Sequence, residues 1–397
     1  SAEFGRNSGA SINVITKGGG NQFHGSLFET IRNDALDARN PFALTQALQP
    51  GQTFNPALPD VNGTKTKDSL TREQFGGSFG FPISKSKTFG FVAAEGLIQN
   101  AQNAVPLLTS TSIFRPDSGG PVINGVPTGN NQQAIIQGLA GLPGNPTVPC
   151  LTGPPAVVVP AATCAQLLTS ALTTSSSTGL TAGQVARNQY LVNQFENNGG
   201  LFNYNTRVYF VSGRLDHVFD DRNQAYLRYS FAHDHEESPD VQSLVGFSAG
   251  SSITAYDNTA QVAWFHQFSA RTQNELSIQY NYSSFDVIPN EPGQVGLGIA
   301  GFAALGTNIF LPSTTIMQRP SIADNATVIR GRHTMNFGGG FLWRGNKTDS
   351  HTFFPGRFVF GTLPGGVLSP CLQVPAACGL AGVNPASINP LQSASLG

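Results

Sequence analysis

Strict alternation of apolar and polar residues dominates this chain of 397 residues and is clearest over residues 207–234. Because successive side chains of a strand point to opposite faces, a period of two predicts strands with one apolar and one polar side. The first strand places on its apolar side Tyr209, Val211, Gly213, Leu215 and Phe219, and on its polar side Ser212, Arg214 and Asp216. After the turn DDRN the pattern resumes, with Ala225, Leu227, Tyr229 and Phe231 opposite Arg228 and Ser230. The segment therefore predicts an antiparallel hairpin.

The same alternation recurs along the rest of the chain, as in QFGGSFGFP (74–82), ELSIQYNY (275–282) and HTMNFGGGFLWRG (333–345). Helical periodicity is almost absent. The length suits two or three ordinary domains or one large β architecture, and the repeated strand pattern favours the second. We therefore expect an all-β, antiparallel fold.

The connections between the expected strands alternate between short and long. The short ones lie near residues 84–87, 220–223, 269–272 and 330–332, and the long ones at 33–71, 99–206, 236–257, 286–320 and from 346 onward. A transmembrane β-barrel has tight turns at one end of its strands and long loops at the other, and strands of about ten residues can cross a bilayer at a tilt of ~45°. The aromatic residues at strand ends suit interfacial girdles: Tyr209, Phe219, Trp264, Phe268 and Tyr282. A soluble sandwich or propeller is the alternative.

Composition narrows the class of protein further. Hydrophobic residues make up 39% and charged residues 11% of the chain, and the formal net charge is −1. Without a cluster of Lys and Arg, binding to nucleic acid is not expected. No apolar run reaches the ~18 residues of a transmembrane helix. The first ten residues lack the features of a signal peptide, so a signal for export would lie upstream of Ser1.

Four cysteines form two close pairs in segments rich in Pro, Gly and Ala, which we interpret as loops. Cys150 precedes Cys164, and Cys371 precedes Cys378. Paired loop cysteines indicate an oxidising compartment, and closing a loop of ~15 residues contributes ~3 kcal/mol in the chain-entropy model. We predict both disulfides, since outer loops that lack a hydrophobic core need such crosslinks for stability.

Charged residues on the polar sides of the strands are candidates for lining the interior of a barrel. They are Arg214, Asp216, Arg228, Glu275 and Arg344. Two G-x-S-x-G matches, at residues 76–80 and 246–250, lack the strand–turn–helix context of a nucleophile elbow, so no enzyme is predicted. His233, His235 and Glu236 could contribute to a metal site, but no second cluster completes four ligands, and we expect no metal or cofactor.

Residues 9–42 resemble the junction between plug and barrel in TonB-dependent outer-membrane receptors. The last plug strand of that family reads G-x-x-I/V-N-I/V-I/V-T-K-x-G, and the matching residues are Gly9, Ile12, Asn13, Val14, Ile15, Thr16, Lys17 and Gly19. REQFGGSFGFPISKSKTFGFVAAEG at 72–96 is similar to the second and third strands of the Oar-like subfamily, and FSARTQNELSIQYNY and RHTMNFGGGF are similar to its later hairpins. The resemblance implies a multi-pass barrel in the bacterial outer membrane.

The resemblance also implies a domain organisation. Residues 1–20 would end the plug, 21–362 would form the first part of the barrel with a large extracellular insert at 99–204, and 363–397 would be an extracellular loop. Nine firm strands and a doubtful tenth at RFVFG compare with the 22 that close the family's barrel, so we expect a fragment of a longer protein.

Function follows from the resemblance as an expectation. It implies transport of an unidentified ligand, energised by a periplasmic TonB partner that pulls on the plug, with membrane lipid as a further partner. The alternative is a surface adhesion or interaction protein whose barrel anchors long loops. In either case the long connections should face outside, so a label at Ser175 should react on intact cells and one at Asp221 should not.

Overall fold

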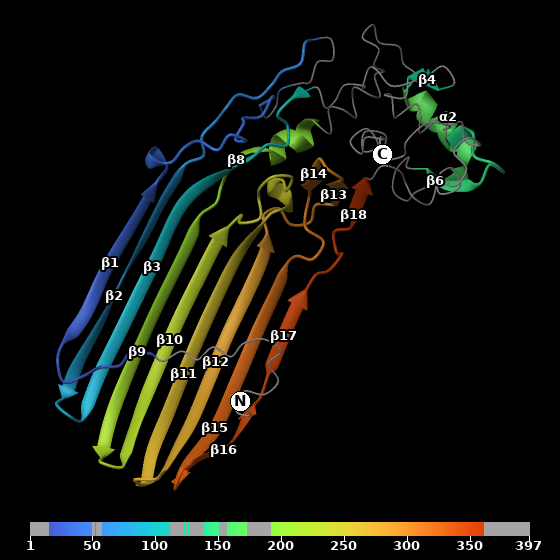
Figure 1. Ribbon diagram of the computed structural model, residues 1–397. Helices are drawn as coiled ribbons and strands as arrows, with labels where there is room; N and C mark the ends of the chain where they lie inside the picture. Colours follow the sequence, from blue (N-terminus) through green and yellow to red (C-terminus); the bar gives the residue numbers. More distant parts are fainter. Residues whose placement is uncertain are drawn as a thin grey trace.

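The computed structural model describes residues 16–49, 52, 58–111, 122–123, 126–127, 139–150, 157–172 and 192–360. One antiparallel sheet dominates this part of the chain (Figure 1). Its order is β1 (His24–Asn33), β2 (Leu70–Ser84), β3 (Thr88–Val105), β9 (Thr206–Asp220), β10 (Asn223–Glu237), β11 (Ser251–Ser269), β12 (Thr272–Pro289), β15 (Ser313–Arg330) and β16 (His333–Leu342). Two short strands extend it: β8 (Gly200–Asn203) pairs with β3, and β17 (Gly345–Ser350) pairs with β15.

The register places apolar side chains in rows on one face of this sheet. One such row runs strand to strand through Leu215, Leu227, Val262, Ile278, Ile322 and Phe341. On five of these strands, the residue adjacent to the apolar one belongs to a second row on the opposite face. This row consists of Arg214, Arg228, Gln261, Gln279 and Ser321. We call these the apolar face and the polar face. The large side chains of the apolar row are exposed, as expected of a surface that meets lipid rather than water.

Tight turns join the strands at one end of the sheet and long connections at the other (Figure 1). The prediction of an all-β antiparallel fold with alternating connections is confirmed. The strands are longer than the predicted length of about ten residues. β11 contains 19 residues, and β3, β12 and β15 contain 18 each. At ~3.3 Å per residue β11 spans about 60 Å, roughly twice the hydrocarbon core of a bilayer, so the strands continue beyond the membrane into the region of the long connections.

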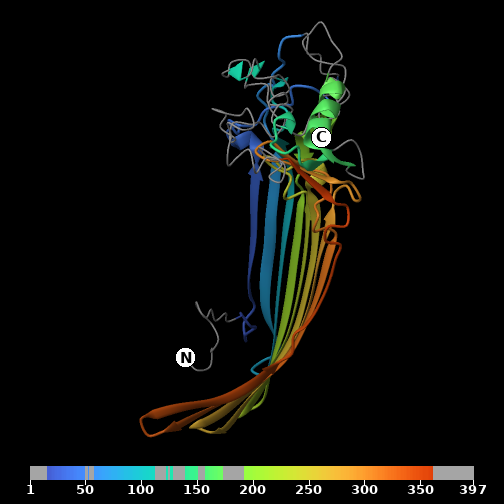
Figure 2. The ribbon, with the colours of Figure 1, turned by 90° about the vertical axis from the view of Figure 1, so that its right-hand side faces the viewer.

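The sheet is a curved wall, and Figure 2 shows that the segment before β1 lies on its concave side. Among the described residues, β1 and β16 each leave one edge without a partner strand. No helix in the described ranges is long and apolar enough to cross a membrane.

The long connections pack against one another around a hydrophobic core of their own. Its largest fully buried members are Phe195, Leu108, Leu305, Val105, Val192 and Val241. The expectation that the outer loops lack a hydrophobic core is therefore wrong for these connections. Alternating patterns reveal strands, whereas the apolar residues of this loop core are scattered over five connections and share no period.

A small three-stranded sheet belongs to the same loop region. It has the order β14 (Ala303–Leu305), β13 (Gly296–Ile299), β18 (Arg357–Phe360), and β18 runs parallel to β13. RFVFG is therefore not a tenth strand of the wall, because its backbone pairs with a loop strand. Further elements are the hairpins β4 (Val122–Ile123)–β5 (Val126–Pro127) and β6 (Thr147–Cys150)–β7 (Val157–Pro160), the helix α2 (Ala161–Leu172) and the 3-10 turns η2 (Asp34–Leu36) and η4 (Phe247–Ala249). Residues 192–198 are also helical.

Candidate functional site

The polar face brings together four of the five charged residues singled out as possible lining. Arg214 and Arg228 are direct cross-strand neighbours, and Asp216 and Glu275 lie on the same face. Arg344 lies in the break between β16 and β17, outside any strand. The break interrupts the alternation that assigned Arg344 a direction, so the pattern no longer determines which face that residue joins.

Arg214 is held in a fixed position by its neighbours. Its Nε lies 3.0 Å from both carboxylate oxygens of Asp216, and its Nη2 donates to Asp216 Oδ1 at 2.7 Å. The guanidinium carbon lies 4.1 Å from the centre of the Tyr226 ring, within range of a cation–π contact. The bidentate ion pair with Asp216 and the ring face of Tyr226 together fix the orientation of the Arg214 guanidinium group. Nη1 makes no hydrogen bond to Asp216 and is left to bind something beyond the sheet.

That remaining group binds the segment before β1. Arg214 Nη1 donates to the hydroxyl of Thr16 at 2.9 Å. A Cβ added to Gly18 would lie 3.1 Å from Asp216 Oδ2, and one added to Gly19 would lie 2.5 Å from the carbonyl oxygen of Gly90 and 2.8 Å from Phe89 Cβ. Because a side chain at position 19 would clash with backbone, glycine allows the segment to lie directly on the wall.

The same segment is fixed at its other end. The backbone N–H of Ser86, in the turn between β2 and β3, donates to Asn21 Oδ1 at 2.7 Å. Residues 16–20 therefore cross the polar face without forming a strand. Of the motif that resembles the end of a plug, Thr16, Lys17 and Gly19 belong to this segment, whereas Gly9, Ile12, Asn13, Val14 and Ile15 lie outside the described residues.

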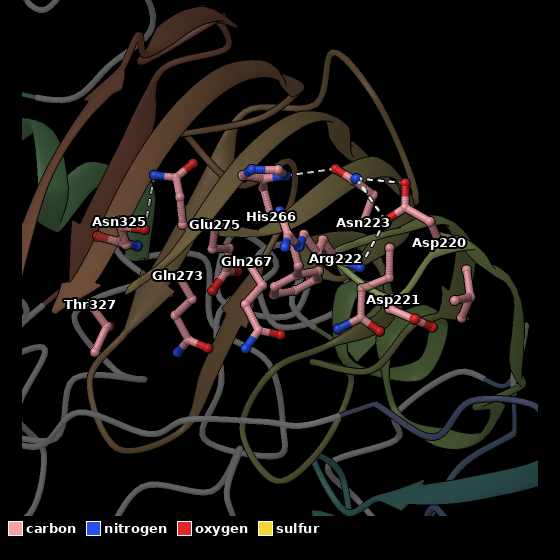
Figure 3. Close-up of a pocket in the computed structure, with 14 residues that line it drawn as sticks. Asp220, Asp221, Arg222, Asn223, His266, Gln267, Gln273, Glu275, Asn325 and Thr327 are labelled. Carbon is pink, nitrogen blue, oxygen red and sulfur yellow. Dashed lines mark hydrogen bonds between the residues drawn. The ribbon is translucent and has the colours of Figure 1, made fainter. Parts of the chain in front are cut away.

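A second feature of the polar face is a hollow at the turn end of the sheet, with a volume of about 280 Å³ (Figure 3). Carboxylate and amide side chains from five strands and one turn line it, including Asp221, Glu275, Gln267, Gln273 and Asn325. Asp220 organises the turn, accepting from the backbone N–H of Arg222 at 2.8 Å and from Asn223 Nδ2 at 2.9 Å. His266 Nδ1 lies 2.7 Å from Asn223 Oδ1. Asp220, Asn223 and His266 thus form a linked set of hydrogen bonds at one side of this polar hollow.

The cysteine predictions stay largely untested. Cys164, in α2, is buried and disulfide-bonded. Its predicted pairing with Cys150 remains a prediction. Cys371 and Cys378 lie outside the described residues.

The two G-x-S-x-G serines have structural partners. The hydroxyl of Ser78, inside β2, lies 3.0 Å from that of Ser26 on β1. Ser248 is buried in the loop region, where its N–H and hydroxyl donate to Asn198 Oδ1 and its oxygen accepts from the Gly306 N–H. His233 and His235 point to the apolar face and Glu236 to the polar face. In the described ranges no group of three His, Cys, Asp or Glu residues could hold a metal ion.

Sequence reasoning missed the contacts that position Arg214. Tyr226 and Asp216 are cross-strand neighbours. Alternation indicates that both lie on the polar face, but the two-residue turn alone would place Asp216 opposite Leu227, because a register shift between Asn223 and Gln224 moves the pairing by one residue. The approach of Gly19 to Gly90 had no such signal, because the two residues are far apart in the sequence.

Comparison with known proteins places the chain in a family. Residues 15–394 match the family model described as "Outer membrane beta barrel domain". The match extends over most of the chain, so the chain belongs to this family and is a protein of the outer membrane. No curated protein sequence matches it.

Two solved structures show distant similarity. The outer membrane transporter YddB from Escherichia coli is 6% identical with a TM-score of 0.39, and 76% of this chain aligns with 29% of that one. FpvA of P. aeruginosa, bound to a pyoverdine and iron, is 10% identical with a TM-score of 0.33, and 74% of this chain aligns with 34% of that one. The chain thus spans about a third of the length of either protein or less.

Proposed function

We propose that the complete protein imports a ligand across the outer membrane, and that a periplasmic TonB partner energises this step. The observation that supports the proposal most directly is the segment Thr16–Gly20, which lies on the polar, concave face and is held there by Arg214. A segment attached to the inside of a barrel wall is what a transporter with a movable filling domain requires. An adhesin that uses its barrel only as an anchor has no need of it.

The contacts of this segment suit reversible release. Thr16 is held by one hydrogen bond to a charged donor, a contact that contributes about 1.5–3 kcal/mol. Breaking it leaves Arg214 still paired with Asp216 and Tyr226, so no charge is left uncompensated. Ligand binding outside shifts such an equilibrium only by its differential affinity for the two states. We propose that a pull from the periplasm supplies the remaining work.

No catalytic step forms part of the proposal. The two serines in G-x-S-x-G matches bind Ser26 and Asn198, in a strand and in a buried loop contact. The proposal covers a glycan, a peptide or a metal chelate as the ligand, and no described residue chooses among these three classes. No cofactor or nucleic acid is part of the proposed mechanism.

Uptake by cells that express the full-length gene tests the proposal. Accumulation of labelled glycans, peptides and metal chelates would be compared with and without a proton gradient. We expect one class to accumulate only while the gradient is present. Uptake that continues unchanged after the gradient collapses would indicate a passive pore, and surface binding without uptake of any class would favour the adhesin.

A matched pair of arginine variants tests the role of the segment. Arg214→Met removes the donor to Thr16, whereas Arg228→Met removes the cross-strand neighbour, whose Nε has no hydrogen-bond partner among the described residues. Loss of a bond of about 1.5–3 kcal/mol should raise the passive entry of a large hydrophilic antibiotic by roughly tenfold in the first variant and leave the second near wild type. Equal permeability of the two variants would remove the assigned role from Arg214.

A further inference from the structure

We propose that the polar face carries, at its end toward the long connections, a binding site for a primary ammonium group of the transported ligand. The site consists of Thr206, where β9 begins, and of Asp234 and Glu236 near the end of β10. The inference rests on the proposed import, because it assigns one chemical group to the ligand. A peptide, a glycan or a metal chelate can each carry such a group.

The register of β9 and β10 brings the three side chains together on one face. Glu236 is the direct cross-strand partner of Thr206, and Asp234 pairs with Val208, the next residue of β9 on that face. Directly opposed residues have Cβ atoms about 4.5–5.5 Å apart, and residues two apart on one strand are separated by about 6.6 Å. The two carboxylates are close enough to repel each other. All three groups can therefore reach one ligand atom.

None of these three side chains has a hydrogen-bond partner among the described residues. Thr206 is 7% exposed, and its hydroxyl is buried without a partner. Asp234 Oδ1 is buried and unpaired as well, and Glu236 makes neither a hydrogen bond nor an ion pair in the described ranges. A buried acceptor without a donor is costly. A change of one rotamer turns each of the two short side chains toward the interior, where an entering ammonium group would supply the missing donors.

No described cation pairs with the two carboxylates. The side chains beside them on the same face are apolar: Val208, Ile253 and Ala255. Arg207 points to the opposite face, where it donates to the carbonyl of Gln99 and to Asn100 Oδ1. Arg228 lies on the polar face of β10 but about 20 Å from Asp234 along the strand. Two like charges in apolar surroundings attract a cation more strongly than they would in water.

The set of acceptors matches an ammonium group better than other cations. A primary ammonium has three N–H donors and no acceptor, and the site offers two carboxylates and one hydroxyl on two strands. A guanidinium is planar and suits one carboxylate bound through two parallel hydrogen bonds. A Ca²⁺ ion takes about six to eight oxygen ligands, and the described part of the chain has no cluster of three side chains that could hold a metal.

Equilibrium binding to the purified full-length protein in detergent provides the test. The probes are a peptide with one lysine, an oligomer of glucosamine and an amine-bearing trihydroxamate chelate of iron, each paired with its N-acetylated form, which lacks the charge. We expect one free amine to bind about tenfold more tightly than its acetylated form, as for one hydrogen bond between charged groups. The pair that shows this preference identifies the class of ligand. Equal affinity within every pair would overturn the proposal.

Binding in detergent needs neither TonB nor a proton gradient, so the two proposals can fail separately. Equal affinity within the pairs leaves energised import of a ligand without an amine intact. Preference for a free amine, together with uptake that ignores the gradient, would overturn the proposed import and support the binding site.

Matched variants of β10 assign the preference to this site. Asp234→Asn and Glu236→Gln keep the shape of the side chain and remove one charge each, so each should lower the preference about tenfold. Glu237→Gln makes the same change one residue further, on the opposite face, where an amide oxygen can still accept from Asn205, and should keep the full preference. Thr206→Val removes the unpaired hydroxyl and should weaken binding of the free amine without lowering the Tm. Full preference in Asp234→Asn and Glu236→Gln, as in Glu237→Gln, would end the proposal.

Discussion

Asp68, in the connection before β2, is a residue whose charge the fold opposes. Burial raises the pKa of its carboxyl, and a hydrogen bond from the backbone of Ala104 offsets only part of the rise. Because the folded state prefers the protonated acid, Asp68 favours folding most below the ordinary pKa of 3.8, and this contribution is lost as the pH rises through the raised value.

Asp68→Asn keeps the shape of the side chain and removes the charge. We therefore expect a higher Tm than wild type at pH 7 and a similar Tm near pH 3, measured by thermal unfolding in detergent. Asp349→Asn changes a carboxylate that is 76% exposed and should leave the Tm unchanged at both pH values. A lower Tm for Asp68→Asn at pH 7 would mean that the ionised form has a partner that stabilises it.

At the scale of the strand, alternation predicts opposite effects for neighbouring residues. Ile278 belongs to the exposed apolar row of β12, and Gln279 belongs to the polar row. Lysine on the lipid face of a barrel costs about 2–4 kcal/mol near the middle of the bilayer, whereas lysine on the other face meets polar side chains. Urea unfolding in lipid vesicles should show Ile278→Lys destabilised by that amount and Gln279→Lys close to wild type. Equal destabilisation would contradict the assignment of the faces.

Asn198 connects three of the long connections through one side chain. Its Oδ1 accepts from the Ser248 N–H at 2.7 Å, Ser248 in turn binds Gly306, and its Nδ2 donates to the carbonyl of Gln194 at 2.8 Å. Asn198→Ala leaves a buried donor without a partner, which costs about 1–3 kcal/mol. Hydrogen exchange should accelerate in residues 238–250 and 291–311 but not in the wall strands. Unchanged exchange in those loops would show that their hydrophobic core suffices.

The strands of the wall could be predicted from the sequence, whereas the loop region could not. A buried or lipid-facing side forces a period of two on every strand, as in β9 and β10. Their register was less predictable, because an irregularity between Asn223 and Gln224 shifts it by one residue from the pairing that the turn begins. The loop core brings together buried residues such as Leu108 and Leu305, which are far apart in the sequence and follow no period. RFVFG has the composition of a strand, but only the structure shows its pairing with β13. The contact of Thr16 with Arg214 is equally non-local.

At the scale of the whole molecule, the end of the sheet that faces outside can be determined by labelling. Asp221 lies in the turn between β9 and β10, at the end predicted to face the periplasm. Phe354, which is 85% exposed, lies at the opposite end, among the long connections. On intact cells, an impermeant thiol reagent should label Phe354→Cys and spare Asp221→Cys. The reverse result would invert the topology, and with it the direction of the proposed transport.

The central claim is that the sheet is the wall of a barrel, with the polar face toward an aqueous interior and the apolar face toward lipid. Three pairs of adjacent residues test it most directly, Gln261 and Val262, Ile278 and Gln279, and Ser321 and Ile322, since each pair points to opposite faces of one strand. Each would be replaced by cysteine in the full-length protein in vesicles and exposed to a water-soluble thiol reagent. The account predicts fast reaction at 261, 279 and 321 and protection at 262, 278 and 322. Protection of both members of each pair, or the reverse alternation, would contradict it.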